Sequence, residues 1–317
     1  MIRVLSPGLM TTVQDGGRRG WQQFGVPVCG AMDEYSLALA NRLVDNEPDE
    51  AALEITLLGP SLRFEVPCVF AVCGGEFEMK LDGQAIEPAR AYAASFGAVL
   101  EIGPARQGAR AYLAVAGGFD LPIVLGSRST SLKGGFGGYE GRRLLKDDQL
   151  PLRAPMPWLP FMEYRVLDRE LRQYPLEDRP ARVVLGPQQE RFSGKGVETF
   201  LAGSYRLTGE SDRMGYRLEG PAIEYAPGCD GNIISDGVVM GAVQVPSGQP
   251  IVMMADRQTT GGYAKIAVVI SADLPLLAQK KAGDTVRFSA VEPRAAIRLW
   301  KKQQSFLRNL DFCRDYL

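Results

Sequence analysis

Short runs of apolar residues, separated by glycines and prolines, recur along the whole chain. Residues 68–73 form a continuous apolar run, and residues 77–81 then alternate between apolar and charged side chains. A continuous run is typical of a buried strand, and a period of two is typical of a strand with one buried face. We expect a tight turn at Gly74-Gly75 between these two strands and a second hairpin turn at Asp82-Gly83.

The same patterns predict further strands elsewhere in the chain. The 36 glycines and 21 prolines supply the turns that many short strands require. The sequence therefore predicts a mainly β protein. The additional strands are expected at residues 99–102, 110–116, 181–185, 205–208, 242–245, 251–255, 265–270 and 285–288.

Helical signals are few. Asp33 precedes a helical pattern at residues 34–44 and is expected to cap it. A short helix is predicted at 188–192, and residues 292–317 carry the clearest helical pattern. In that C-terminal helix we expect one face, packed on its own chain or against a partner, formed by Ile297, Trp300, Leu307 and Leu310.

Prolines mark a boundary near the middle of the chain. The segment 152–160 holds three prolines between positions 155 and 160, which neither a sheet nor a helix interior tolerates. We therefore predict a first domain at 1–154, a second at 161–290 and a C-terminal helix at 291–317. Weak similarity between the halves is consistent with two copies of one β-barrel fold or with chance.

Composition agrees with a soluble globular protein of more than one core. The chain has 317 residues, of which 45% are hydrophobic and 23% charged. Its 36 Lys+Arg against 37 Asp+Glu give no basic excess for nucleic acid. No apolar run reaches the roughly 18 residues that span a membrane. The five cysteines form no C-x-x-C pair, and no signal sequence follows Met1, so we expect free thiols in the cytoplasm.

The chain contains no histidine. This excludes Ser-His-Asp and Cys-His catalysis, and zinc sites built on imidazole. Any chemistry must use carboxylates, Lys, Arg, Tyr, Thr, Gln or backbone amides, and we assign no metal ligands.

Two glycine-containing segments in the first half carry polar side chains. Residues 11–18 place hydroxyls, an amide, Asp15 and Arg18 beside Gly16-Gly17, although a polar loop would have the same composition. Residues 126–142 offer exposed amides and positive charge for a phosphate or carboxylate group, or form a mobile surface loop. The phosphate-binding candidates in the second segment are Lys133, Gly134, Gly135 and Arg142.

Two further polar strings, at 211–218 and 256–265, lie in the second half. The second string follows the apolar run 251–255 directly. Polar groups crowded at a strand end are costly to bury without partners, so we favour a ligand site over a solvated turn.

Five strings occur in a fixed order: Thr-Thr-Val-Gln-Asp-Gly-Gly-Arg (11–18), Gly-Ala-Met-Asp (30–33), Gly-Ser-Arg-Ser-Thr (126–130), Ser-Asp-Arg-Met-Gly-Tyr-Arg-Leu (211–218) and Asp-Arg-Gln-Thr-Thr-Gly-Gly-Tyr (256–263). From Ser6 to about Phe288 the chain thereby resembles the biotin-dependent carboxyltransferase family. This family includes allophanate hydrolase subunit 2, the carboxyltransferase part of urea carboxylase, and the C subunit of bacterial 5-oxoprolinase.

The resemblance implies two tandem cyclophilin-like β-barrel domains and a heteromeric enzyme. The partners would be the B subunit of 5-oxoprolinase, an allophanate hydrolase subunit 1-like protein, and the A subunit of the same enzyme. The reaction would be the ATP-driven opening of a small amide substrate, 5-oxo-L-proline, to L-glutamate. Whether this chain itself binds ATP stays open.

Two alternative functions are compatible with the same resemblance. One is carboxyl transfer from carboxybiotin to urea or a related amide. Because the chain lacks biotin carboxylase and biotin carrier regions, these would act in trans, and its standalone form is closer to the 5-oxoprolinase component. The other is a non-catalytic antagonist that sequesters a kinase-inhibitor protein.

The resemblance also implies the residues that line the site. Asp256, Arg257 and Lys265 are the catalytic candidates, with Lys265 or Asp256 transferring a proton, and Lys265 is expected beside Arg213 or Arg257. The substrate-binding candidates are Asp15, Arg18, Arg128, Arg213, Gln258, Thr259, Thr260 and Tyr263.

Overall fold

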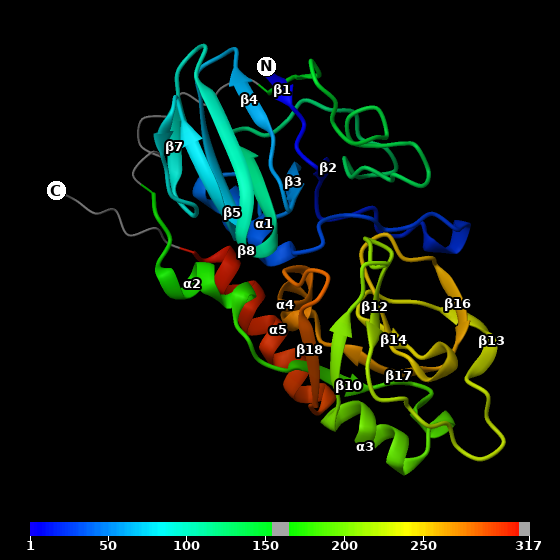
Figure 1. The fold of residues 1–317 in the computed structure, drawn as a ribbon. Helices are drawn as coiled ribbons and strands as arrows, with labels where there is room; N and C mark the ends of the chain where they lie inside the picture. Colours follow the sequence, from blue (N-terminus) through cyan, green and yellow to red (C-terminus); the bar gives the residue numbers. More distant parts are fainter. Residues whose placement is uncertain (154–164, 311–317) are drawn as a thin grey trace. The chain divides into compact units, whose positions relative to one another are not determined.

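The computed structural model describes residues 1–153 and 165–310, which form two compact units (Figure 1). The first unit contains Met1–Arg19, Cys29–Leu176 and the chain end from Phe306. The second contains Gly20–Val28 and Glu177–Ser305. The prolines of the predicted boundary, at 155–160, lie outside the described residues.

The first unit is built on a nine-stranded sheet. Its order is β2-β3-β8-β4-β1-β9, and β5 pairs with β6, β7 and β8. Its helices include α1 (Glu34–Leu43) and the short α2 (Arg169–Gln173). The strands are β1 (Ile2–Ser6), β2 (Met10–Gln14), β3 (Ala52–Thr56), β4 (Ser61–Phe64), β5 (Cys68–Leu81), β6 (Gln84–Ala85), β7 (Ala91–Ala94), β8 (Val99–Val115) and β9 (Gln149–Leu150).

The long strands β5 and β8 lie side by side through the centre of this sheet (Figure 1). The predicted turn at Gly74-Gly75 is wrong, because β5 continues through both glycines. Gly74 has a φ of +123°, and a Cβ there would lie 2.4 Å from the Arg110 carbonyl oxygen. The glycine thus permits a close approach of two strands and a bulge, rather than a reversal of the chain.

The second predicted turn, Asp82-Gly83, is confirmed. Both residues have positive φ angles, 50° and 79°, as a type I′ turn requires. Leu81 pairs with Gln84 across it.

Both faces of the first sheet are buried. The side chains of one face pack together in an apolar core, which includes Val13, Leu53, Leu113 and Phe70. The opposite face carries Ala52 and other side chains that pack under α1. As predicted, Asp33 caps α1: its carboxylate accepts a hydrogen bond of 2.9 Å from the Ser36 amide.

The second unit contains a closed barrel of seven strands in the order β10-β17-β14-β15-β12-β11-β18. A separate two-stranded ribbon joins β13 to β16. The strands are β10 (Ala181–Leu185), β11 (Ser204–Leu207), β12 (Gly215–Glu219), β13 (Asn232–Gly237), β14 (Ala242–Gln244), β15 (Ile251–Met253), β16 (Thr260–Tyr263), β17 (Lys265–Val269) and β18 (Thr285–Ala290). The helices are α3 (Gly194–Ala202), α4 (Leu274–Ala278) and α5 (Pro293–Arg308), whose last turn belongs to the first unit.

The prediction of a mainly β protein with few helices and a C-terminal helix is confirmed. Among the described residues only the second unit forms a closed barrel, whereas the first forms a sheet with a more open strand order. The sequence analysis did not predict α3, because the glycines at 194 and 196 have low helix propensity. The Ser193 hydroxyl caps this helix by accepting a hydrogen bond of 2.9 Å from the Gly196 amide.

The expectation that four residues of the C-terminal helix form one packed face is only partly met. Leu307 and Leu310 are buried in the core of the first unit, but Ile297 and Trp300 are 54% and 42% exposed. Leu310 also lies beyond the last helical residue, Arg308, so it cannot belong to a face of the helix.

No helix in the described part of the chain is long and apolar enough to cross a membrane. Its four cysteines, Cys29, Cys68, Cys73 and Cys229, are free thiols. Burial raises the pKa of the Cys68 thiol to about 12. The cytoplasmic location stays a prediction.

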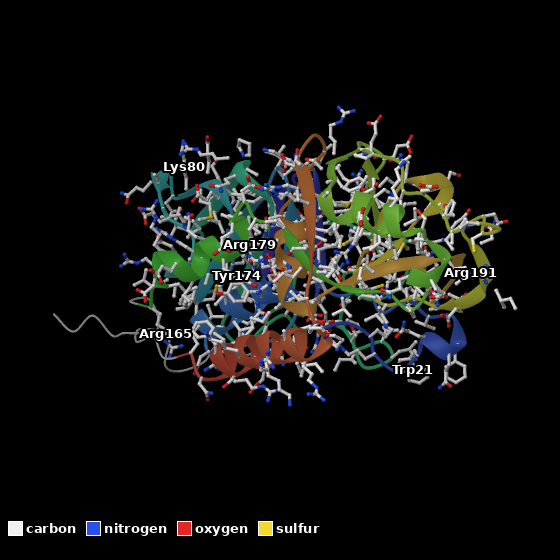
Figure 2. The ribbon with its side chains drawn as sticks, turned by 90° about the horizontal axis from the view of Figure 1, so that it is seen from below. Trp21, Lys80, Arg165, Tyr174, Arg179 and Arg191 are labelled. Atoms are coloured by element: carbon white, nitrogen blue, oxygen red, sulfur yellow. The ribbon has the colours of Figure 1, made fainter. Side chains whose placement is uncertain are left out.

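A buried carboxylate anchors the second unit near β10. Asp273 is fully buried, and its two oxygens accept hydrogen bonds from the guanidinium groups of Arg179 (2.9 and 3.0 Å) and Arg182 (2.9 and 2.6 Å). Figure 2 labels Arg179 among the side chains. Burial acts to raise the pKa of Asp273, but the hydrogen bonds from both arginines outweigh it and hold the pKa below its usual value.

We predict that Asp273→Asn lowers the free energy of unfolding by about 2–4 kcal/mol at pH 7, because two cations lose their counter-charge. Since the folded-state pKa of Asp273 is depressed, its contribution is complete above the unfolded-state pKa of about 3.9 and is lost as the pH falls through the folded-state value. Urea unfolding between pH 3 and 7 measures both effects. The control Asp178→Asn removes an 80% exposed carboxylate and should change little; equal losses for both variants would contradict the prediction.

Candidate functional site

A row of polar side chains crosses the α1-facing side of the first sheet. Opposite residues in antiparallel strands share a face, and Thr12 pairs with Glu54, which pairs with Tyr112. Gln14 lies on the same face as Thr12, two residues along β2. All four side chains are buried. We call Thr12, Gln14, Glu54 and Tyr112 the polar row.

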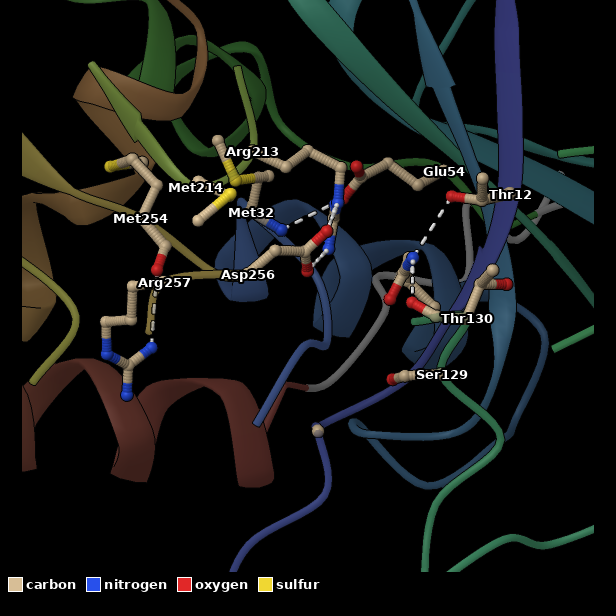
Figure 3. Close-up of polar contacts among 12 residues, drawn as sticks. Thr12, Met32, Glu54, Ser129, Thr130, Arg213, Met214, Met254, Asp256 and Arg257 are labelled. Atoms are coloured by element: carbon tan, nitrogen blue, oxygen red, sulfur yellow. Dashed lines mark hydrogen bonds and ion pairs between the residues drawn. The ribbon is translucent and has the colours of Figure 1, made fainter. Parts of the chain in front are cut away.

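Glu54 is the centre of this row. Its Oε2 accepts hydrogen bonds from the Tyr112 hydroxyl (2.7 Å) and from the Met32 amide (2.9 Å; Figure 3). Burial, and then the neighbouring Glu54 carboxylate, raise the pKa of Tyr112 well above its usual value. Tyr112 therefore stays a neutral hydrogen-bond donor to a buried anion.

Asp15 locks two distant loops together directly after β2. Its carboxylate accepts from the Gly17 amide (2.8 Å), the Ser127 hydroxyl (2.7 Å), the Ser129 hydroxyl and the Arg128 amide. These bonds occupy both oxygens, so Asp15 organises the 127–129 segment.

Arg18 lies in the same loop cluster and is fully buried. Its Nε and Nη2 donate to the carbonyls of Val124 (2.8 Å) and Ser129 (2.9 Å), and its guanidinium lies 4.8 Å from the centre of the Phe136 ring. Gly137 packs against it: with φ +72°, a Cβ there would lie 2.7 Å from Nη2. The structure thus brings Arg18 to the glycine-rich segment.

Arg128 and Arg142 are held by protein groups. Arg128 donates to the Leu121 carbonyl (3.0 Å) and lies 3.5 Å from the Glu50 carboxylate. Both terminal nitrogens of Arg142 bond to Asp148, at 2.7 and 2.9 Å, and Nη2 also bonds to Glu140.

The remaining phosphate-binding candidates, Lys133, Gly134 and Gly135, are exposed near the tip of their loop. The hydrogen bonds to Asp148 raise the pKa of Arg142 above its usual value and occupy both terminal nitrogens of its guanidinium group. This segment therefore presents a lysine and glycines at its surface, without the guanidinium that the phosphate hypothesis also used.

In the second unit, strand register brings Arg213 to Asp256. Gly215 of β12 pairs with Met253 of β15, so the residues that flank these strands meet as well. The Asp256 amide donates to the Arg213 carbonyl at 2.8 Å. The side chains form a two-pronged ion pair, with both N–O distances 2.9 Å and only about a tenth of each side chain exposed (Figure 3).

Arg257 braces the loop that follows β15. It is buried, and its Nε and Nη1 donate to the carbonyls of Val238 (3.1 Å) and Met254 (3.3 Å). The Val238 amide in turn donates to the Thr259 carbonyl at 3.0 Å. Arg257 thus joins the end of β13 to the loop that carries Asp256.

Lys265 begins β17 and is buried, with 3% of its surface exposed. Its Nζ lies 3.1 Å from Oδ2 of Asp236, rather than beside an arginine as the sequence suggested. The side chain of Asp236 is 58% exposed. Hydrogen bonds from Lys265, and then from the Gly237 amide, lower the pKa of Asp236, and Gln188 contacts both members of the pair.

The other candidates of this unit point outward. Gln258, Thr260 and Tyr263 are exposed, and Thr259 is partly buried. Gln258 and Thr259 lie in the loop before β16, Thr260 begins β16 opposite Gly237, and Tyr263 ends it opposite Asn232. The second unit therefore presents hydroxyl and amide groups together with a nearly buried ion pair, Arg213–Asp256, and a half-exposed one, Lys265–Asp236, an arrangement suited to a small polar molecule.

Several polar residues of these sites were missed from the sequence. Glu54 is the one charged residue in the otherwise apolar run 51–55, and a single charge in a predicted buried strand is a signal for a functional or paired carboxylate. Gln14 was read as part of a loop but ends β2. Asp236 and Gln188 carry no local signal, because only the ribbon β13–β16 and the turn after β10 bring them to Lys265.

Comparison with known proteins gives the chain a context. A family described as carboxyltransferase domain, subdomain A and B, matches residues 24–290. The C subunit of 5-oxoprolinase from Escherichia coli is 38% identical over 98% of this chain and 97% of its own, and that of Haemophilus influenzae is 38% identical over 97% and 96%. The crystal structure of Kluyveromyces lactis urea carboxylase superposes with a TM-score of 0.91 at 32% identity, covering all of this chain but 30% of that one.

We predict strong coupling between Arg213 and Asp256. Arg213→Met or Asp256→Asn alone should lower the free energy of unfolding by about 2–4 kcal/mol, because each leaves a nearly buried charge, and the double variant should lose at least about 1 kcal/mol less than the sum. Urea unfolding of the four proteins measures the coupling. The exposed pair Arg206–Glu219, at 2.7 Å, is the matched control and should give no more than about 0.5 kcal/mol; equal couplings would refute the prediction.

Proposed function

We propose that this chain, which belongs to the carboxyltransferase domain family, subdomain A and B, is the C subunit of an ATP-dependent 5-oxoprolinase. Acting with the A and B subunits, it would open 5-oxo-L-proline to L-glutamate. The observation that carries the proposal is the alignment with relatives named as this component of 5-oxoprolinase, over nearly the full length of both chains.

Carboxyl transfer from carboxybiotin to urea or a related amide is the second candidate. It is favoured by the superposition on urea carboxylase. However, this chain spans under a third of that protein, so the biotin-linked steps would need other chains. Both candidates share an amide-type substrate.

On the glycine-rich segment, Asp148 fills the fork of Arg142 and Glu50 neighbours Arg128. Lys133 is the phosphate-binding candidate with an exposed charge. We propose that ATP binds mainly to another chain of the complex.

The second unit supplies the groups for proton transfer. When the lactam is hydrolysed to L-glutamate, an oxygen from water bonds to the carbonyl carbon, the ring C–N bond breaks, and the leaving nitrogen takes up a proton. We assign this donation to Lys265, whose buried Nζ is paired with an exposed, displaceable carboxylate of Asp236. Asp256 bonds through both oxygens to Arg213, so we assign it a positioning role.

Gln258, Thr260 and Tyr263 supply exposed hydrogen-bonding groups beside these pairs, and we propose that they contact substrate. Arg257 would hold their loop through the Val238 and Met254 carbonyls. We also propose that both β units are cyclophilin-like domains.

The proposal is tested by reconstitution with co-expressed A and B subunits. We predict ATP hydrolysis that depends on 5-oxo-L-proline and yields L-glutamate only when all three chains are present. Urea with bicarbonate and a biotinylated carrier protein is the matched assay for the second candidate. Activity in that assay alone would replace the proposed function with carboxyl transfer.

Lys265→Met should lower kcat of the reconstituted enzyme by at least about a hundredfold, the range typical of a lost general acid. The control Lys195→Met removes an exposed lysine of α3 in the second unit and should leave kcat unchanged. Steady-state kinetics with a thermal unfolding check separates chemistry from folding. Parent-like kcat in a folded Lys265→Met enzyme would remove Lys265 from the mechanism.

A further inference from the structure

Helix α5 carries positive charge that no other described residue neutralises (Figure 1). Between Pro293 and Ser305 the helix has no carboxylate, and its cations are exposed. They are Arg294, Arg298, Lys301 and Lys302. Their side chains form no hydrogen bond or ion pair with another residue in the described part of the chain. By contrast, the exposed side chains of Arg19, Arg106 and Arg206 each meet a carboxylate of their own chain.

The arrangement of these cations weakens the helix that carries them. Arg294, Arg298 and Lys302 follow one another at intervals of four residues, which places like charges in one column where they repel. Arg294 also lies in the first turn, where the positive end of the helix dipole disfavours a cation. Because neutral residues would suit the helix better, the charge column is best explained by an anionic partner.

Beside the cations, α5 exposes two large apolar side chains. Ile297 and Trp300 are 54% and 42% exposed, and three residues of spacing make them neighbours on the helix surface. Tryptophan and arginine are enriched among the residues that contribute most to binding between proteins. We call this surface the outer face of α5; it consists of Arg294, Ile297, Arg298, Trp300, Lys301 and Lys302.

We propose that the outer face of α5 is the docking surface for another protein chain, one that presents clustered carboxylates around an apolar pocket. The carboxylates would neutralise the charge column, and the pocket would remove Ile297 and Trp300 from water. The inference rests on the proposed function, because that function supplies the chains to be tested, the A and B subunits.

The same face is less suited to a membrane or a nucleic acid. A helix binds a bilayer by inserting a whole apolar face, but Leu307 of α5 is buried and Phe306 packs against the same core of the first unit. Nucleic acid offers phosphate groups to the cations but would leave Ile297 and Trp300 without an apolar partner. A protein surface satisfies both parts of the outer face.

The test is calorimetric titration of this chain with the separately purified A and B subunits at about 50 and about 300 mM NaCl. The charge variant combines Arg294→Gln, Arg298→Gln and Lys302→Gln. It should weaken binding to the partner subunit about tenfold at low salt, the loss expected for several exposed ion pairs, and should reduce the salt dependence. Trp300→Ala should weaken binding about tenfold at both salt concentrations.

The matched control is a second triple variant that combines Lys195→Gln, Arg217→Gln and Lys281→Gln. It removes the same charge from exposed positions of the second unit and should leave the affinity unchanged. Thermal unfolding of each variant is the second measurement. The charge variant should unfold at or above the parent's temperature, because the repulsion within α5 is relieved. Unfolding at a lower temperature would assign the cations to the fold and overturn the inference.

The outcomes separate the docking surface from the proposed function. Parent-like affinity in both α5 variants overturns the inference, and a complex that still hydrolyses ATP with 5-oxo-L-proline then keeps the proposed function. Tighter binding of the parent to phosphatidylserine vesicles or to duplex DNA than to either subunit also overturns the inference. Absence of binding to both subunits overturns the two proposals together. A complex that assembles through α5 without that ATP hydrolysis overturns the proposed function alone.

Discussion

The register of β2, β3 and β8 is the constraint on which the first unit depends. It aligns Thr12, Glu54 and Tyr112 on one face of the sheet and Val13, Leu53 and Leu113 on the other. A slip of one residue in β3 would place Glu54 in the apolar core and Leu53 against Tyr112. Burying an unpaired carboxylate costs several kcal/mol, so the polar row itself specifies the register.

The same row also places the first helix. The Tyr112 hydroxyl accepts from the Asp33 amide at 2.8 Å, while Glu54 accepts from the preceding amide, that of Met32. The start of α1 is therefore bonded to the centre of the sheet, and the cap at Asp33 satisfies the Ser36 amide in the first turn. Secondary structure and sheet packing share one set of hydrogen bonds.

In both units, the partners of the cationic side chains follow from the free-energy cost of burying a charge. Arg18 and Arg257 donate to backbone carbonyls, whereas Arg142 and Arg213 each meet a carboxylate through two bonds. These groups hold loops in place, as expected for buried or half-buried guanidinium forks. Lys265 differs, because its counter-ion is mostly exposed. This contrast, rather than residue type, separates the candidate catalytic cation from the arginines that shape the site.

The sequence by itself determined four features: the β-rich pattern, the Asp82-Gly83 turn, the cap at Asp33 and the ordered strings that mark the family. These depend on a few adjacent residues. Only the tertiary structure decided that Gly74 continues a strand and that Lys265 meets Asp236. It alone also decided that Gln14 faces the Thr130 carbonyl, which lies 116 residues away. The physical reason is that strand register and the burial of unpaired polar atoms depend on contacts between distant segments, which no local pattern specifies.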